Sequence, residues 1–265
     1  MASVHSYLFV PGDRPERFDK ALAAGAGSVI IDLEDAVPPQ GKQAARAALQ
    51  AWLASASAPV AVRINAADTA WFQEDLAVCA SPNVCAVMLA KADRPEDLAA
   101  CARAAPQARL LPLIENASGF DALRALAAVA GVERFVFGSI DFQLDLGIAG
   151  EGEALLLFRS QLVLASRLGQ LAAPVDGVTT DIHDAAKVQE AAARARSLGF
   201  GAKLCIHPAQ VAAVNAAFRP TAQEIDWARR VLEAAARCGG AAATVDGKMI
   251  DRPVMLRAQA LLDAG

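Results

Sequence analysis

The sequence has no long uninterrupted apolar run. Hydrophobic residues make up 55% of its 265 positions and the mean hydropathy is positive, but much of this apolarity is alanine. No stretch approaches the roughly 18 apolar residues that a membrane-spanning helix needs. The N-terminal segment MASVHSYLFV lacks the basic region, the apolar region and the cleavage site of a signal peptide. We therefore expect no membrane association and a cytoplasmic location.

Basic patches and paired cysteines are also lacking. The formal net charge is −4, and the lysines and arginines are scattered, so nothing points to nucleic acid as a partner. Only three histidines are present, which argues against a zinc site. The odd number of cysteines and the absence of any C-x-x-C pair predict reduced thiols packed as small hydrophobes. These cysteines are Cys79, Cys85, Cys101, Cys205 and Cys238.

Eight short apolar runs alternate with alanine-rich amphipathic segments. Several runs are nearly continuous in apolar character, as strands buried on both faces are, and alanine favours helix in the segments between them. This order predicts parallel strands joined by helical crossovers, and eight such units in about 250 residues match a (β/α)8 TIM barrel. The expected strands cover residues 6–11, 28–34, 59–65, 83–91, 108–115, 133–141, 173–180 and 202–208.

An open, doubly wound sheet is the competing architecture. It would have fewer strands and a dinucleotide fingerprint, yet neither G-x-G-x-x-G nor G-x-x-x-x-G-K-[ST] occurs. We therefore assign residues 1–215 to the barrel and 216–265 to a C-terminal helical extension. Within this extension we expect a helix over 221–239, a turn at the Asp-Gly pair and a last helix.

Charged residues stand where several of the expected strands end. Glu115 and Asp141 close consecutive strands, so their carboxylates should be neighbours at the face where barrel active sites lie. Two carboxylates, with water and substrate oxygens completing the shell, commonly hold Mg2+. Position alone leaves a second interpretation open, in which each acid caps a helix or pairs with an arginine.

Further candidate residues lie at the same face. Arg63 suits bidentate binding of a carboxylate, but it also suits a salt bridge to Glu34 or Asp35. We interpret these two acids as groups that orient the waters of a bound metal. Lys91 allows Schiff-base chemistry with a carbonyl substrate, or an ion pair. His207 precedes a proline, and we interpret it as structural.

Five motifs, in order, resemble the citrate lyase beta subunit (CitE-like) group of the HpcH/HpaI aldolase and citrate lyase superfamily. The resemblance spans almost the whole chain, and its first and last motifs are specific. In FGSIDFQLDLG the two residues between glycine and aspartate differ from those of many relatives, which bears on substrate choice. The motifs are LFVPGDRPERFDKALAAGAGSVIIDLEDAVPPQGKQAAR, VRIN, LPLIENASGF, FGSIDFQLDLG and DGKMIDRPVMLRAQALL.

The resemblance implies a Mg2+-dependent lyase that cleaves a β-hydroxyacyl thioester into an acyl thioester and a 2-oxo acid. The thioester would be of the citryl-, citramalyl- or malyl-CoA type, or carried by a protein. It implies a homotrimer or homohexamer, with Glu115 and Asp141 as metal ligands and Arg63 and Glu115 at the substrate. Asp251 would transfer a proton, entering the neighbouring subunit's site, and Arg14 would meet an anionic group of the ligand together with backbone amides of the PGDR segment.

Two alternatives remain open from the sequence. A metal-independent aldolase would use Lys91 as its Schiff-base lysine. A non-catalytic subunit of a citrate lyase complex would keep the barrel but bind Mg2+ weakly or not at all.

Overall fold

The computed structural model describes residues 4–237 and 243–264. The chain divides into two compact units, Met1–Asn215 and Ala216–Gly265. Within the described ranges, no helix is both long enough and apolar enough to cross a bilayer.

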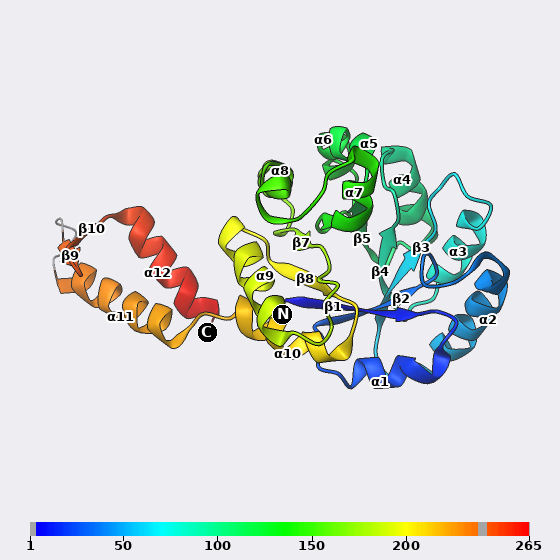
Figure 1. The fold of residues 1–265 in the computed structure, drawn as a ribbon, viewed down its shortest axis with the longest axis horizontal. Coiled ribbons are helices and arrows are strands. Elements are labelled where there is room, and N and C mark those ends of the chain that lie inside the picture. The colour runs from blue at the N-terminus through cyan, green and yellow to red at the C-terminus, as the bar shows by residue number, and fades with distance from the viewer. Residues whose placement is uncertain (1–3, 238–242, 265) are drawn as a thin grey trace. The chain divides into compact units, whose positions relative to one another are not determined.

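The first unit is a closed barrel of eight parallel strands, so the predicted (β/α)8 TIM barrel is confirmed (Figure 1). The strands neighbour one another in chain order, and pairing of Ser6 with Lys203 closes the ring. The strands are β1 (Ser6–Pro11), β2 (Ser28–Asp32), β3 (Val60–Ile64), β4 (Val84–Leu89), β5 (Arg109–Ile114), β6 (Val136–Phe137), β7 (Val175–Asp176) and β8 (Ala202–Cys205).

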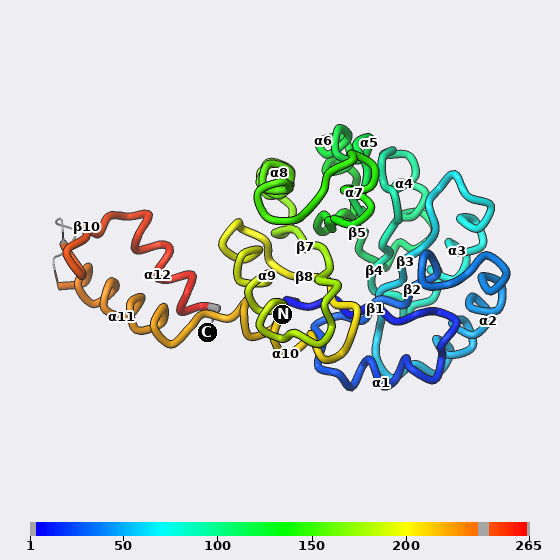
Figure 2. Tube along the Cα trace, in the orientation of Figure 1, coloured from blue at the N-terminus to red at the C-terminus, as the bar shows by residue number. Residues whose placement is uncertain are grey.

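Helices surround this barrel, and the chain can be followed from strand to helix around it in Figure 2. Asp184 caps the N-terminus of α9 by accepting from two backbone amides, and Gly199 ends that helix with a left-handed φ of 98°. The helices are α1 (Phe18–Leu22), α2 (Lys42–Leu53), α3 (Phe72–Cys79), α4 (Pro95–Ala104), α5 (Ala117–Asp121), α6 (Leu123–Ala127), α7 (Ser139–Leu146), α8 (Leu156–Leu168), α9 (Ala185–Leu198) and α10 (Pro208–Phe218). Short 3-10 turns cover Pro15–Arg17, Pro39–Gly41 and Gly152–Leu155.

Apolar side chains from the strands fill the barrel interior, as the near-continuous apolar runs predict. Cys79, Cys101 and Cys205 are buried free thiols, which agrees with the interpretation as small hydrophobes, and Cys85 is half-buried. Cys238 lies outside the described residues. The interior cluster comprises Tyr7, Ile30, Ala61, Ala86, Met88, Leu111, Leu113, Val136, Val175, Ala202 and Leu204.

Two of the predicted strands are much shorter in the structure. The strand expected over 133–141 is only Val136–Phe137, and that expected over 173–180 is only Val175–Asp176. After Phe137 the chain passes through Gly138 and enters α7 at once. Asp141 therefore does not end a strand but lies in the first turn of α7, and the expected strand end is wrong.

The second unit has the predicted helices and an additional hairpin. It contains α11 (Ala222–Arg237), β9 (Ala243–Val245), β10 (Lys248–Ile250) and α12 (Arg252–Ala264). The antiparallel strands join at Asp246 and Gly247, whose φ values are 53° and 73°. Two successive positive φ values are what an Asp-Gly hairpin turn requires, so this pair marks a hairpin as well as the expected turn.

Candidate active site at the barrel mouth

A cavity of about 390 Å³ opens where the barrel strands end. Five charged residues line it, namely Asp32, Asp35, Arg63, Glu115 and Asp141. The remaining walls are largely apolar and come from Phe9, Leu113, Phe137, Ile140, Val178, Leu204 and Ile206. The structure thus brings the two predicted metal acids and the predicted substrate arginine into one cavity.

Arg63 is held by three acids: Asp32 at the end of β2, and Glu34 and Asp35 in the segment that follows it, which we call the β2 loop. Its Nε and Nη2 donate to the two carboxylate oxygens of Asp32 at 2.7 and 2.6 Å. Its Nη1 lies 3.1 Å from Glu34 Oε2 and 3.5 Å from Asp35 Oδ2. The guanidinium also stacks over the Phe9 ring, 4.8 Å from its centroid. Because bidentate pairing fixes the plane of the guanidinium, Arg63 is oriented before any ligand binds.

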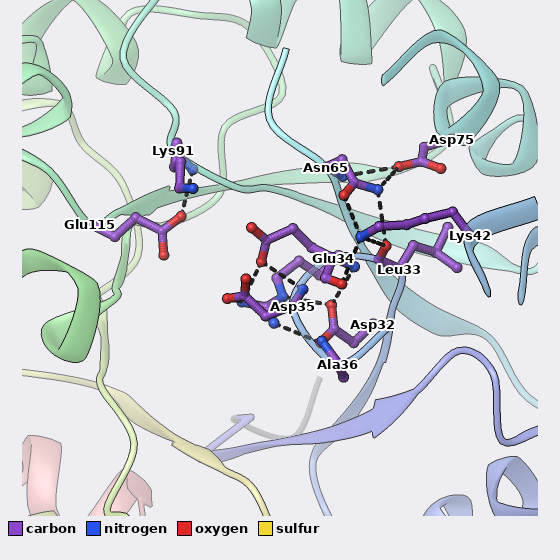
Figure 3. A network of polar contacts seen from close by, with 11 residues as sticks. Asp32, Leu33, Glu34, Asp35, Ala36, Lys42, Asn65, Asp75, Lys91 and Glu115 are labelled. Carbon is purple, nitrogen blue, oxygen red and sulfur yellow. Dashed lines mark hydrogen bonds and ion pairs between the residues drawn. The ribbon is translucent and has the colours of Figure 1, made fainter. Parts of the chain in front are cut away.

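The buried ammonium of Lys42 holds the β2 loop in place, as Figure 3 shows. Its Nζ donates to the carbonyl oxygens of Leu33 and Glu34, each at 2.8 Å, and to Asn65 Oδ1 at 2.7 Å. Asn65 Nδ2 in turn donates to the buried Asp75 at 2.6 Å. All three protons of the ammonium are thereby used within the protein, so Lys42 acts as a structural tether of the loop.

Glu115 follows β5 directly, and its side chain is 3% exposed. Its Oε1 accepts from the backbone amide of Lys91 at 2.7 Å. Among the described residues, no hydrogen bond reaches its Oε2. A Cβ atom added at Gly138 would lie 2.5 Å from Glu115 Cβ and 2.7 Å from Oε2. Only glycine therefore leaves room for this carboxylate beside the start of α7.

Asp141 is presented by α7, and aromatic packing holds that helix in place. The buried Phe142 ring contacts Phe137 at 5.3 Å and Phe158 at 4.8 Å between centroids, both edge to face. Asp141 is half-buried, and within the described ranges its carboxylate makes no hydrogen bond or ion pair. Its oxygens are thus free to bind a ligand of the cavity.

The enclosed acids keep their protons more tightly than ordinary carboxyl groups. Burial raises the pKa of Glu115 to about 8, the charge of Glu34 adds to this rise, and Arg63 opposes it. Burial likewise raises the pKa of Glu34 to about 7, against the lowering effect of Arg63. A cation bound beside these carboxyls would favour their ionised forms and so oppose the rise in pKa.

The donor set fits Mg2+. Glu115 Oε2 and the Asp141 carboxylate are hard oxygen donors that have no partner among the described residues, and both acids line one cavity. Over the described part of the chain, no three His, Cys, Asp or Glu side chains form a complete metal cage. Mg2+ is typically held by one or two carboxylates while water and substrate oxygens fill its octahedron, so two free acids suit it.

The structure places other predicted residues away from the cavity. The Lys91 side chain is exposed and lines a separate pocket with Asp68 and Asp93, and only its backbone amide reaches Glu115. Its φ of 50° turns the chain at this point. This position speaks against Schiff-base chemistry by Lys91 in the cavity. His207 is exposed, and its Nδ1 accepts from the Ala209 amide at 3.2 Å.

The PGDR segment contributes less to the cavity than expected. Pro11 lines it, but Arg14 is exposed and lies 3.9 Å from Asp13. The Gly12 amide donates to Asp32 O at 2.8 Å and the Arg14 amide to Pro11 O at 3.1 Å. Internal carbonyls already occupy these two amides, so an anion at this segment would have to be met by the Asp13 amide or by the Arg14 side chain.

Asp251 belongs to the second unit and stands immediately before α12. Its Oδ1 accepts from the Val254 amide at 3.1 Å, so it caps this helix. The side chain is exposed. Because only Oδ1 is used for this cap, the exposed Oδ2 of Asp251 can still contact another molecule.

Sequence reasoning missed Asp32, which is the best partner of Arg63. It also missed the buried group of Arg159, Asp176 and Lys203 behind β7 and β8. One signal was present: Asp32 ends an apolar strand and follows Ile30 of the interior cluster at the two-residue spacing of one strand face, so it points inward. Asp176 directly follows Val175 of the same cluster and therefore lies on the outer face of β7. Buried acids at strand ends require cationic partners.

The sequence is similar to those of known proteins over most of its length. A citrate lyase subunit beta-like protein of Mycobacterium tuberculosis is 39% identical over 264 residues, covering 97% of this chain and 93% of that protein. A (3S)-malyl-CoA thioesterase of Cereibacter sphaeroides is 33% identical over 254 residues, covering 93% and 89%. The crystal structure of CitE from Mycobacterium tuberculosis in complex with magnesium, acetoacetate and coenzyme A matches with a TM-score of 0.88 and 35% identity, covering 99% of this chain and 98% of that chain.

The family pattern of HpcH/HpaI aldolase/citrate lyase matches residues 5–208, which span the barrel from its first strand to the start of α10. The cavity with Arg63, Glu115 and Asp141 lies within this range. This protein therefore belongs to the HpcH/HpaI aldolase/citrate lyase family.

Proposed function

We propose that this protein is a Mg2+-dependent carbon–carbon lyase that cleaves a β-hydroxyacyl thioester into an acyl-CoA and a 2-oxo acid. The observation that carries the proposal is the pair of carboxylates, Glu115 and Asp141, that face one cavity with Arg63 and have oxygens free for a metal. The relatives named for citrate lyase and for malyl-CoA, and the CitE structure with magnesium and coenzyme A, support the thioester class.

Glu115 and Asp141 would hold Mg2+. When bound, the ion supplies Lewis-acid polarisation of the carbonyl oxygen of the 2-oxo acid. Each terminal nitrogen of Arg63 carries two N–H groups, so the contacts with Asp32 and Glu34 leave donors over for an anionic ligand. The apolar walls of the cavity exclude water and strengthen these polar contacts.

The reaction balances without an oxidant. The β-hydroxyl group loses its proton and becomes the carbonyl of the 2-oxo acid as the carbon–carbon bond breaks. The bond electrons pass to the thioester as an enolate, whose charge Arg63 would offset, and protonation of its α-carbon releases the acyl thioester. We assign the proton transfer to Asp251 of a neighbouring subunit in a homotrimer or homohexamer.

The test is the release of products from malyl-, citramalyl- and citryl-CoA, each with Mg2+ and then with excess EDTA. A 2-oxo acid formed from one thioester, and stopped by EDTA, would establish the lyase. Free coenzyme A without any 2-oxo acid would indicate thioester hydrolysis instead. No product from any of the three, with Mg2+ present, would favour a carrier-protein thioester or a non-catalytic subunit.

Asp251→Asn is expected to keep the fold and ligand binding while lowering kcat by about 100-fold, the usual contribution of a positioned acid–base group. Asparagine still accepts the hydrogen bond from Val254, so the α12 cap persists. Steady-state kinetics with the active thioester measures the effect. Unchanged turnover would remove the proton-transfer role from Asp251.

Mg2+ affinity is expected to fall as the pH drops below about 8, because the raised pKa of Glu115 means that the ion must displace a proton there. Below this pH the Mg2+ affinity should fall by up to about tenfold per pH unit, because each ion bound releases one proton from Glu115. Calorimetry from pH 6.5 to 8.5 in buffers of different ionisation enthalpy measures both the affinity and the proton. A constant affinity without proton release would contradict the expectation.

A further inference from the structure

A second cavity of about 370 Å³ lies beside the candidate active site, and the two share the lining residues Ile140 and Val178. Three cationic side chains line it: Arg159, Arg194 and Lys203. None of the three belongs to the first cavity. The structure thus gathers more positive charge behind Ile140 than in the site already described.

The acids of this region do not balance its cations. Asp176, which is fully buried, accepts from Arg159 Nε at 2.8 Å and from Lys203 Nζ at 3.1 Å. Glu151 accepts from Arg159 Nη2 at 2.8 Å and lies 3.5 Å from Arg194 Nη2. Three cations against two carboxylates leave one positive charge in excess at this cavity.

Hydrogen-bond donors are also left over. Within the described residues, Arg159 Nη1 and Arg194 Nε are buried and have no hydrogen-bond partner. Lys203 Nζ has three protons and contacts two acceptors, Asp176 and the carbonyl of Gly177. Arg159 is 2% exposed, so bulk water does not satisfy it. Buried charged donors without acceptors are costly, and native sites supply them with a ligand or ordered water.

We propose that this second cavity, which we call the Arg159 cavity, binds an oxyanion group, either a carboxylate or a phosphate. Guanidinium groups recognise both, because their planar donor forks match two oxygens of the anion. The hydroxyl groups of Thr179 and Thr180 line the same cavity and can add donors. The excess charge of the three cations that line the cavity would then meet one ligand.

Inorganic phosphate is the probe, titrated calorimetrically into the whole protein at constant ionic strength. Arg194→Gln removes a cavity cation that is 37% exposed and leaves the buried Arg159–Asp176 pair intact. We expect saturable binding to the unsubstituted protein and a loss of about tenfold or more in affinity in Arg194→Gln. Arg194→Lys, which keeps the charge, should retain part of the affinity.

Arg196→Gln is the matched control, because it lies on the same helix, is similarly half-buried and changes the net charge equally. Its phosphate affinity should stay within about twofold of that of the unsubstituted protein, since screening weakens charges outside the cavity. No saturable binding of phosphate, or equal losses in Arg194→Gln and Arg196→Gln, would overturn the proposal.

A kinetic measurement identifies the source of the anion, and this step alone rests on the proposed function. If the oxyanion is a group of the thioester substrate, phosphate raises KM without changing kcat, and Arg194→Gln raises KM as well. If it is a separate anion, phosphate binds equally well with the first cavity filled. The calorimetric test needs no turnover, so it remains decisive even if the lyase activity is not found.

Discussion

Asp141→Asn is expected to lower Mg2+-dependent release of the 2-oxo acid by about a thousandfold or more, because the substitution removes the charge of a metal ligand. The fold should be unaffected, since Asp141 is half-buried and makes no hydrogen bond or ion pair among the described residues. Glu115→Gln should reduce activity equally. Burial raises the pKa of the Glu115 carboxyl to about 8, because the ionised form is costly in this buried position. Glutamine removes the charge that the ion would bind and, with it, this cost.

The measurement pairs initial rates with Mg2+ affinity from calorimetry, and both should fall together. Asp145→Asn is the matched control, because it makes the same change one turn further along α7. Asp145 accepts from the Ala117 amide and does not line the cavity, so its loss should leave Mg2+ affinity unchanged. Full activity in either Asp141→Asn or Glu115→Gln would remove that residue from the metal site.

Arg63→Met is expected to abolish lyase activity and to lower the free energy of unfolding by about 3–5 kcal/mol near pH 8, as breaking a buried ion pair does. The guanidinium is 9% exposed and contacts Asp32, Glu34 and Asp35. Its removal leaves Asp32 as a buried carboxylate without its bidentate partner. Urea unfolding followed by circular dichroism measures the loss.

The loss in Arg63→Met should be smaller at pH 5 than at pH 8. Burial raises the pKa of Glu34 from its ordinary 4.5 to about 7, although the charge of Arg63 lowers this pKa. Removing Arg63 should therefore raise the pKa of Glu34 further. With a raised pKa the folded state binds more protons than the unfolded state, and stability therefore falls as pH rises from about 4.5 through the folded-state value. At pH 5 Glu34 is protonated and lacks the repulsive charge that it carries at pH 8.

Arg94→Met is the control for this substitution. Arg94 is exposed and pairs with Asp97 at 2.8 Å on the barrel surface, where solvent screening leaves such pairs with little effect on stability. Its loss should be small at both pH values. If Arg63→Met cost no more than Arg94→Met, the buried acids would not depend on Arg63.

The barrel was predictable because its signal is local. Apolar runs buried on both faces, such as 6–11 and 59–65, alternate with alanine-rich segments, and this order alone excludes most other architectures. Glu115 and Arg63 were found in the same way, since polar groups near the ends of such runs gather at one face of a barrel. Asp141 was wrongly placed at a strand end because β6 ends before Gly138 and α7 begins directly after it. A glycine in the sequence does not indicate whether a strand, a turn or a helix follows.

The pairing of charges was not predictable from the chain alone. Asp32, rather than Glu34 or Asp35, gives Arg63 its bidentate partner, because β2 and β3 place these two residues opposite each other. Lys91 stands beside Glu115, yet its backbone rather than its amine makes the contact. Local periodicity was therefore enough for the order of the strands and helices and for the end of the barrel that carries the acids, but not for the extents of β6 and β7. Which charged groups meet required the assembled barrel, because side-chain direction and strand register bring together residues far apart in the sequence.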